Sequence, residues 1–268
     1  MTAGEQRKKR ERADRMLVER GLAESREKAQ ALIMAGVVFD GARRVGKAGE
    51  RLFLDADLKV AGDPVPYVGR GGLKMEAALD RFGIDPDGCT ALDVGASTGG
   101  FTDCLLQRGA RKVYALDVGR GQIHWKLRTD PRVELMEGVN ARHLPADSFA
   151  EPIDLATVDV SFISLRLVVP AVRRAAHPAE WAVLVKPQFE VGRRQVERGG
   201  LVRDPAKHRR VLEEIVEMAA GEELDARGII PSPIRGAEGN REFLLHLAPG
   251  GSKSEPSVVS RWIEEATE

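Results

Sequence analysis

The sequence predicts an α/β protein with a doubly wound, mostly parallel sheet, preceded by a small α+β domain. From residue 90 onward, short apolar runs alternate with helical patterns, which is typical of parallel sheets covered by helices on both faces. Residues 1–61 instead hold two short helical patterns followed by small strands. Residues 62–72, with two prolines and several glycines, fit a linker. We therefore predict a small domain over 1–61, a linker over 62–72 and a main domain over 73–268.

The composition is that of a globular protein with an uneven distribution of charge. The chain has 268 residues, 43% of them hydrophobic, and a formal net charge of zero. Residues 1–62 nevertheless carry 14 Lys and Arg against 10 Asp and Glu. A small basic domain on a slightly acidic body suggests that the domain binds an anion such as nucleic acid.

Other features bear on the compartment. Gly4–Arg15 is highly charged, unlike a signal peptide, and no run of 18 apolar residues occurs, so we expect no membrane segment. Cys89 and Cys104 are the only cysteines and lack the spacing of a metal site. We expect two buried thiols, no bound metal and a reducing, cytoplasmic location.

The small domain contains the following predicted elements. Residues 1–12 are polar and basic and fit a disordered or fraying start. Arg12–Glu19 has helical spacing and stops at Gly21, and a second helix, Arg26–Met34, begins after the N-cap candidate Ser25. Short strands are expected at residues 37–41, 52–54 and 58–60.

Thr90–Asp103 (T-A-L-D-V-G-A-S-T-G-G-F-T-D) predicts a strand, a small-residue loop and a helix, which together place a ligand at a helix N-terminus. The dinucleotide pattern G-x-G-x-x-G and the phosphate pattern G-x-x-x-x-G-K-[ST] are both absent from the loop. Asp93 at the strand end suits a cationic ligand better than a pyrophosphate. A sulfonium with an amino-acid tail, S-adenosylmethionine (SAM), fits that preference.

The next strand ends at Asp117, where a carboxylate can accept both hydroxyls of a ribose. An ordinary turn with an incidental aspartate is the alternative, and Asn140 fits a turn residue as well as a ligand contact. The predicted SAM-binding residues are Asp93, Gly95, Ala96, Ser97, Thr98, Gly99, Gly100, Phe101, Asp117, Val118 and Asn140.

The rest of the body continues the alternation. Predicted strands are 111–119, 132–137, 153–161, 181–187, 228–234 and 241–247, and predicted helices are 74–82, 123–127, 165–176, 205–224 and 257–267. Residues 188–204 lack periodicity and fit an active-site or substrate loop. The carboxyl ends of parallel strands lie at one edge of the sheet, so Asp93, Asp117, Asp159 and Lys186 are expected to gather there.

Two lysines and two carboxylates carry a specific resemblance. Lys74 in GRGGLK, Asp159 in VDVSFIS, Lys186 in LVKPQFE and Glu242 in GNREF match the K-D-K-E set of FtsJ-type ribose 2′-O-methyltransferases. The stretch RGLAESREKAQALIMAGVVFDG resembles the S4 RNA-binding domain. An S4 domain fused to such a body, with DVGASTGGFTD, DVSFIS and VKPQFEVG, is closely similar to the TlyA family over essentially the whole chain.

The resemblance implies a Rossmann-like SAM-dependent methyltransferase with a seven-stranded sheet, acting on the ribose 2′-OH of cytidine in 16S or 23S ribosomal RNA, or in both. Lys186 would accept or polarise the hydroxyl proton, Asp159 and Glu242 would hold that lysine, and Lys74 would stabilise the developing alkoxide. For each of the four, a buried ion pair between strands is the alternative. The S4 resemblance implies phosphate contacts from Arg12, Arg15, Arg20, Ser25, Arg26 and Lys28.

The linker departs from some members of that family, because P-Y-V-G-R-G lacks the Arg and Trp that precede the Val in them. Three other functions stay open: 2′-O-methylation of another structured RNA, RNA binding by an inactive SAM fold, and a membrane-active haemolysin, the last disfavoured by the missing apolar segment. The expected partners are ribosomal RNA or ribosomal subunits, with no membrane and no obligate protein partner.

Overall fold

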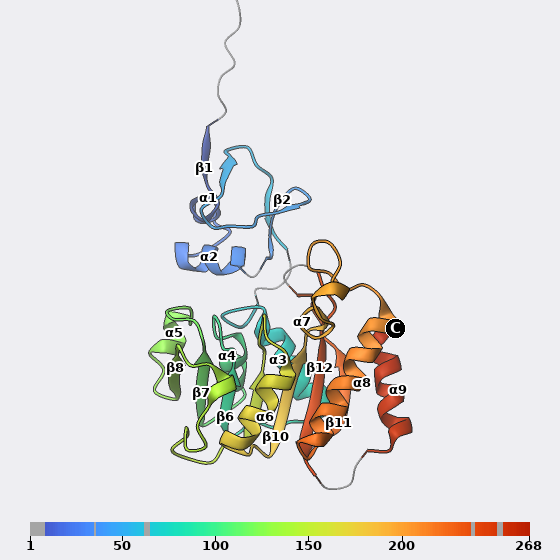
Figure 1. The fold of residues 1–268 in the computed structure, drawn as a ribbon. Coiled ribbons are helices and arrows are strands. Elements are labelled where there is room, and N and C mark those ends of the chain that lie inside the picture. Colours follow the sequence, from blue (N-terminus) through green and yellow to red (C-terminus); the bar gives the residue numbers. More distant parts are fainter. Residues whose placement is uncertain (1–8, 35, 62–64, 237–238, 251–253) are drawn as a thin grey trace, which may run out of the picture. The chain divides into compact units, whose positions relative to one another are not determined.

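The structure, a computed structural model, describes residues 9–34, 36–61, 65–236, 239–250 and 254–268. The chain divides into two compact units, Met1–Arg70 and Gly71–Glu268 (Figure 1). Residues 1–8 of the predicted small domain and 62–64 of the predicted linker lie outside the described residues. The second unit begins with a helix at Gly71, so the last two residues of the predicted linker belong to that helix.

Over its described residues, the N-terminal unit holds two helices and two small sheets. Its elements are β1 (Arg10–Arg12), α1 (Ala13–Glu19), α2 (Arg26–Met34), β2 (Val38–Asp40), β3 (Arg43–Arg44), β4 (Arg51–Phe53) and β5 (Leu58–Val60). The prediction of a disordered start is wrong at its end, because Arg10–Arg12 pairs with Arg51–Phe53 in an antiparallel ladder. The predicted helix ends hold: Gly21 has a φ of +69°, and Ser25 Oγ accepts a hydrogen bond from the Lys28 amide at 3.2 Å.

The second unit is built on a seven-stranded sheet, as the sequence predicts. Its strands are β6 (Thr90–Val94), β7 (Lys112–Asp117), β8 (Val133–Glu137), β9 (Leu155–Val158), β10 (Glu180–Val185), β11 (Leu224–Pro231) and β12 (Phe243–Pro249). They are arranged in the order β11-β12-β10-β9-β6-β7-β8. The five strands from β6 to β10 are parallel, and β12 runs antiparallel to β10 and to β11. The chain changes direction across the sheet between β6 and β9, which is where ligands bind in open α/β sheets.

The helices of this unit are α3 (Gly71–Phe82), α4 (Gly100–Gln107), α5 (Trp125–Arg128), α6 (Leu165–Ala176), α7 (Pro187–Glu190), α8 (Pro205–Gly221) and α9 (Pro256–Thr267), with short 3-10 turns η1 (Ala141–His143) and η2 (Arg193–Gln195). The predicted loop over 188–204 therefore contains most of α7 and all of η2. None of the described helices is long and apolar enough to cross a membrane. Cys104 is buried as expected, but Cys89 is only half-buried.

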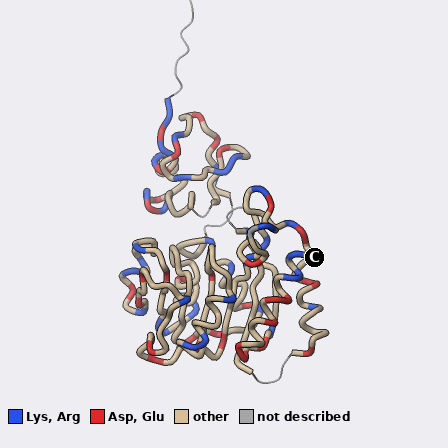
Figure 2. Tube along the Cα trace, in the orientation of Figure 1, with Lys and Arg blue, Asp and Glu red and all other residues tan. Residues whose placement is uncertain are grey.

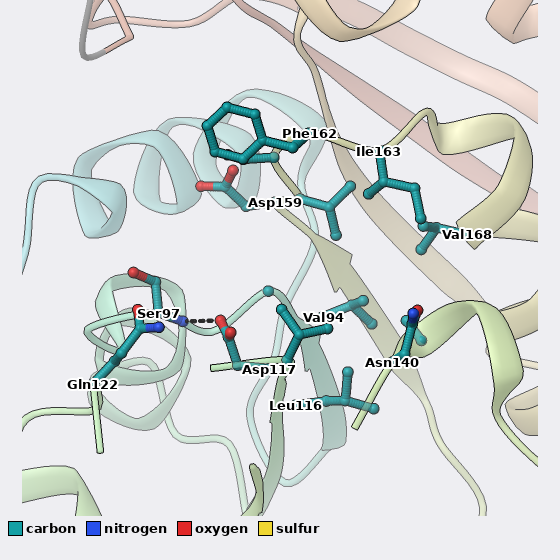
Figure 3. A pocket seen from close by; sticks show the side chains of 15 residues that line it. Val94, Ser97, Leu116, Asp117, Gln122, Asn140, Asp159, Phe162, Ile163 and Val168 are labelled. Atoms are coloured by element: carbon teal, nitrogen blue, oxygen red, sulfur yellow. Dashed lines mark hydrogen bonds between the residues drawn. The ribbon is translucent and has the colours of Figure 1, made fainter. Parts of the chain in front are cut away.

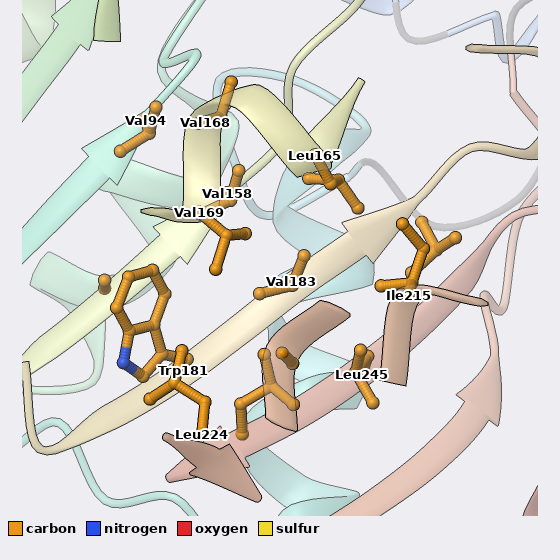
Figure 4. Packing of buried hydrophobic residues seen from close by; sticks show 14 of the residues in the cluster. Val94, Val158, Leu165, Val168, Val169, Trp181, Val183, Ile215, Leu224 and Leu245 are labelled. Atoms are coloured by element: carbon orange, nitrogen blue, oxygen red, sulfur yellow. The ribbon is translucent and has the colours of Figure 1, made fainter. Parts of the chain in front are cut away.

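The core follows from the alternation of side chains along the strands. Leu92, Val94 and Val158 pack in one cluster with residues of α6, α8 and α9, and the fully buried Trp181 is its largest side chain (Figure 4). The intervening residues point to the other face, which is why Asp93 reaches α4. Both faces of the parallel strands are thus covered, and the carboxyl edge of the sheet is left for the site.

Candidate active site

Glycines allow two close approaches around the loop that follows β6. A Cβ at Gly95 would lie 2.3 Å from the carbonyl oxygen of Asp159, and a Cβ at Gly100 would lie 2.9 Å from the backbone nitrogen of Gly72. Any larger residue would push β6 from the end of β9, or α4 from α3. The small residues of this loop therefore serve the packing of the sheet edge as well as the approach of a ligand.

Asp93 does not lie at the ligand site for which it was predicted. Its carboxylate accepts hydrogen bonds from the Thr102 amide and hydroxyl, at 3.0 and 2.6 Å, and from the Thr157 hydroxyl at 3.1 Å. The side chain is fully buried, and this burial raises its pKa to about 6. Asp93 thus faces α4 and Thr157 instead of a ligand cavity, and it ties the start of α4 to the sheet.

A cavity of about 560 Å³ opens at the carboxyl ends of β6, β7 and β9 (Figure 3). Of the predicted SAM-binding residues, it is lined by Gly95, Ser97, Asp117, Val118 and Asn140. The other predicted residues do not line it; besides Asp93 these are Ala96, Thr98, Gly99, Gly100 and Phe101. The loop alone thus supplies only part of the wall, and most of the rest comes from β7, from the segments that follow β7, β8 and β9, and from α6.

Backbone amides orient the polar side chains of this first cavity. Asp117 accepts hydrogen bonds from the amides of Ser97, at 2.8 Å, and of Gly119, at 2.7 Å (Figure 3). Asn140 accepts from the Arg142 amide at 3.1 Å, which begins η1. Leu116, Val160, Ile163 and Val168 add apolar surface to the lining. The cavity therefore combines a fixed carboxylate with an apolar slot.

The four residues of the predicted K-D-K-E set form two ion pairs, in which Lys74, Lys186 and Glu242 are buried and Asp159 is half-buried. Lys186 Nζ lies 2.5 Å from Asp159 Oδ1 and donates to Ser161 Oγ at 2.9 Å. Lys74 Nζ lies 2.6 Å from Glu242 Oε2, although the two residues are 168 positions apart. Asp159 thus pairs with Lys186, the contact that the resemblance implies. Glu242, in contrast, pairs with Lys74 and not with Lys186.

A second cavity, of about 400 Å³, adjoins the first, since Ser161 and Phe162 line both. Its other lining residues are Lys186, Gln188, Phe189, Val196, Gly200 and Glu242. The rings of Phe162 and Phe189 lie 5.1 Å apart, and Phe162 is 92% exposed with a φ of +65°. A phenylalanine held in the left-handed region and open to solvent is strained, and such strain concentrates at functional sites.

Sequence patterns did not single out several residues of the two cavities. Ser161 and Phe162 lie within D-V-S-F-I-S, where an aromatic residue directly after a strand end was the available signal. Gln188 lies in P-Q-F-E directly after Lys186, and Gln122 lies in the loop after β7. Gln188 belongs to the motif LVKPQFE, of which the predicted site includes only Lys186, and nothing in the sequence marks Gln122.

Basic and acidic positions are interspersed along the N-terminal unit (Figure 2). The predicted RNA-binding residues there fall into two groups by their contacts. Arg12 and Arg26 donate to the buried Asp14, at 2.8 and 3.1 Å, and this pairing holds the pKa of Asp14 well below its usual range. Arg20 donates to two backbone carbonyl oxygens, and Ser25 is the N-cap of α2. Arg15 and Lys28 are exposed. Four of the six thus also stabilise the unit itself.

Comparison with known proteins identifies the family. The model of the FtsJ-like methyltransferases matches residues 67–248. An rRNA methyltransferase candidate of Bacillus subtilis, YqxC, is 49% identical over 265 residues, covering 96% of this chain and 94% of the relative. The 16S/23S rRNA (cytidine-2′-O)-methyltransferase TlyA of Mycobacterium tuberculosis is 42% identical over 260 residues, covering 96% of each chain.

Among solved structures, a hemolysin candidate from Streptococcus thermophilus is 41% identical with a TM-score of 0.76, covering 97% of this chain and 96% of the other. The similarity thus extends through both units of the chain, beyond the region that the family model matches. This chain belongs to the TlyA family of FtsJ-like methyltransferases.

Proposed function

We propose that the protein transfers a methyl group from SAM to the ribose 2′-hydroxyl of a cytidine in ribosomal RNA. The observation that carries this proposal is the Lys186–Asp159 ion pair, which stands where the two cavities meet. Methyl transfer needs a donor and an acceptor held side by side, and adjoining cavities provide that proximity. The names of relatives that cover nearly the whole chain support ribosomal RNA and cytidine as the substrate.

The first cavity fits SAM. Its volume of about 560 Å³ lies within the usual range for ligand sites of about 300–1,000 Å³. Asp117 uses two of its acceptor positions on backbone amides and keeps others for ribose hydroxyls, while Leu116, Ile163 and Val168 offer an apolar surface to adenine. SAM, when bound, supplies a methyl group carried on a positively charged sulfur.

The charged residues of the second cavity act on the acceptor together with their ion-pair partners. Lys186 orients the 2′-hydroxyl and accepts or polarises its proton, and Asp159 and Ser161 hold the lysine in place. Lys74, fixed by Glu242, stabilises the negative charge that develops on the oxygen. The exposed ring of Phe162 offers a stacking surface for an unstacked base, as RNA-binding proteins commonly use.

The N-terminal unit supplies the affinity for RNA in this proposal. Its exposed Lys28 is available to meet phosphates, as is the exposed Arg15, which lies 3.9 Å from Glu11 in a surface ion pair. Arg12 and Arg26 instead share their charge with the buried Asp14. Contacts of this kind position an RNA without selecting its sequence. Selection of the target nucleotide is then left to the second cavity.

A transfer assay tests the proposal. The purified full chain is mixed with methyl-labelled SAM and with small ribosomal subunits, large ribosomal subunits or naked rRNA, and label in the RNA is counted. We expect label in at least one of these substrates and none with Lys186→Ala, which should still bind RNA.

The other functions give different results. Absence of label in every RNA overturns the proposal, and label only in an RNA outside the ribosome moves it to another substrate. Lysis of liposomes by the protein without SAM would favour a membrane-active haemolysin. Unchanged methylation by Lys186→Ala would refute the catalytic assignment.

A further inference from the structure

Glu190, the last residue of α7, holds the start of α6. Its Oε2 atom accepts a hydrogen bond from Ser164 Oγ at 2.6 Å, and its Oε1 atom accepts one from the Leu165 amide at 2.9 Å. Burial of this half-buried side chain raises the pKa of its carboxyl group, so the surroundings disfavour the charge itself. The contact therefore depends on two well-placed acceptor atoms more than on a negative charge.

The two segments that Glu190 joins carry the groups of the proposed reaction. Helix α7 begins directly after Lys186, and α6 begins directly after residues 159–164, which follow β9 and are called the β9–α6 loop below. This loop contains Asp159, the partner of Lys186, and it lines both cavities. Glu190 thus makes a second connection between the loop and the segment that follows β10, in addition to the ion pair.

The middle of the β9–α6 loop is strained, because Phe162 has a φ of +65°. A bulky residue keeps such a conformation only where the surrounding contacts enforce it. Helix α7 supplies contacts of this kind: the ring of Phe189 lies 5.1 Å from that of Phe162, and Glu190 holds the end of the loop. Without Glu190, the loop could relax at Phe162 and move relative to Lys186.

We infer that Glu190 is a positioning residue for methyl transfer, an inference that rests on the proposed function. Glu190 lines neither of the two cavities, so it acts through Ser164 and Leu165 and not by touching a substrate. By fixing the β9–α6 loop against α7, it keeps Asp159 beside Lys186 and keeps the wall between donor and acceptor in place. Reacting groups tolerate only small displacements, so a loosened loop should slow the transfer step.

The alternative is that Glu190 only stabilises α6. A negative charge favours a helix N-terminus, and Ser164 Oγ already caps this helix by accepting from the Arg166 amide at 3.2 Å. Two substitutions separate charge from geometry. Glu190→Gln loses the charge but can still accept from the Leu165 amide and donate to Ser164 Oγ. Glu190→Asp keeps the charge but is one carbon shorter, so it cannot reach both donors.

The test measures the single-turnover rate at saturating SAM and ribosomal RNA, divided by the fraction of molecules that bind SAM in calorimetry. Glu190→Met, which loses both contacts, and Glu190→Asp should each be slower by about 10- to 100-fold, the cost of a displacement of about 1 Å. Glu190→Gln should stay close to wild type. The matched control is Asp154→Ala, which removes a carboxylate that accepts from the Thr90 amide at 2.8 Å directly before β9, and which should keep its rate.

Hydrogen exchange provides a readout that does not depend on activity. The exchange of backbone amides in peptides covering residues 159–165 is followed by mass spectrometry in the same proteins without SAM. These amides should exchange faster in Glu190→Met and Glu190→Asp than in wild type, and at the wild-type rate in Glu190→Gln.

The outcomes separate this inference from the function on which it rests. A wild-type protein that methylates no RNA overturns the proposed function. An active wild type together with an unchanged rate per SAM-binding molecule in Glu190→Met and Glu190→Asp overturns the inference alone. A Glu190→Gln variant as slow as Glu190→Asp also overturns it, because the charge and not the geometry would then matter. If Glu190→Met binds no SAM, the comparison of the Asp and Gln variants decides by itself.

Discussion

The two cavities of the second unit share Ser161 and Phe162 but are assembled differently. In the first, a carboxylate is held by backbone amides close by in the chain, as Asp117 is by Ser97 and Gly119. At the second, charged side chains meet from distant segments, since Glu242, which lines it, pairs with Lys74 across 168 positions. The polar contacts that hold Asp117 are thus made within two loops, whereas the charged groups beside the second cavity depend on the whole sheet. Substitutions in the two cavities should therefore separate affinity from rate.

The largest effect is expected at Lys186. Lys186→Ala should lower the single-turnover rate of methyl transfer by about 100- to 10,000-fold, since loss of a positioned proton acceptor has this size. Its affinity for SAM, measured by calorimetry, should stay within about twofold of wild type because Lys186 does not line the first cavity. Lys112→Ala, an ion-paired lysine at the opposite edge of the sheet, is the control and should keep its rate. A large loss of SAM affinity in Lys186→Ala would contradict the separation.

The pair of Lys74 and Glu242 comes next. Lys74→Met leaves a buried carboxylate without its cation, and Glu242→Gln leaves a buried ammonium without its anion. Each change should lower the free energy of unfolding by about 3 kcal/mol, measured by denaturant titration. The double variant should lose less than the two single losses together, because neither charge is then stranded. Fully additive losses would show that the two groups do not interact.

At Asp93 we expect a pH-dependent change in the free energy of unfolding that is no larger than the loss expected for the Lys74–Glu242 pair. Its folded-state pKa of about 6 lies above the ordinary value of 3.8, so the folded protein holds this proton more tightly than the unfolded chain. Wild-type stability should therefore fall by up to about 3 kcal/mol from this group as pH rises from about 4 to about 6. Asp93→Asn does not titrate, so its stability relative to wild type should improve over that window. A difference that stays flat with pH would show that Asp93 ionises normally.

A moderate effect on affinity is expected at Asp117. Asp117→Asn should weaken SAM binding by about 10-fold, the value of one hydrogen bond to a charged group. The rate at saturating SAM should remain near that of wild type, because Asp117 does not touch the acceptor cavity. Asp147→Asn, at an exposed position, is the matched control. A drop in rate with unchanged affinity at Asp117 would reverse the assignment of the two cavities.

The smallest effect is expected in the N-terminal unit. Lys28→Ala should weaken RNA binding a few-fold. The slope of log affinity against log salt concentration should become shallower by about one, as expected for the loss of one phosphate contact. In the wild-type protein Lys59 is ion-paired with Asp57 at 2.7 Å, so Lys59→Ala should change this salt dependence less. Equal changes in the two variants would remove Lys28 from the RNA-binding surface.

The difference between contacts made within loops and contacts made by distant segments also explains which features could be predicted from the sequence. The strand, loop and helix around Thr90–Asp103 were predictable because hydrophobic pattern and small residues act locally. The partners of buried side chains were not, since they depend on the fold. Asp93 accepts a hydrogen bond from Thr157, which lies 64 positions further along the chain, and Glu242 pairs with Lys74. Strand β1 was missed because its three polar residues form a strand only through pairing with β4.

The most direct test of the account is the identity of the methylated atom. Ribosomal RNA treated with the wild-type protein and SAM is digested to nucleosides and analysed by mass spectrometry. The account predicts 2′-O-methylcytidine, since the paired lysines are suited to a ribose hydroxyl and not to a ring carbon or nitrogen. A methyl group on the cytosine ring, or on the ribose of another nucleoside alone, would contradict it.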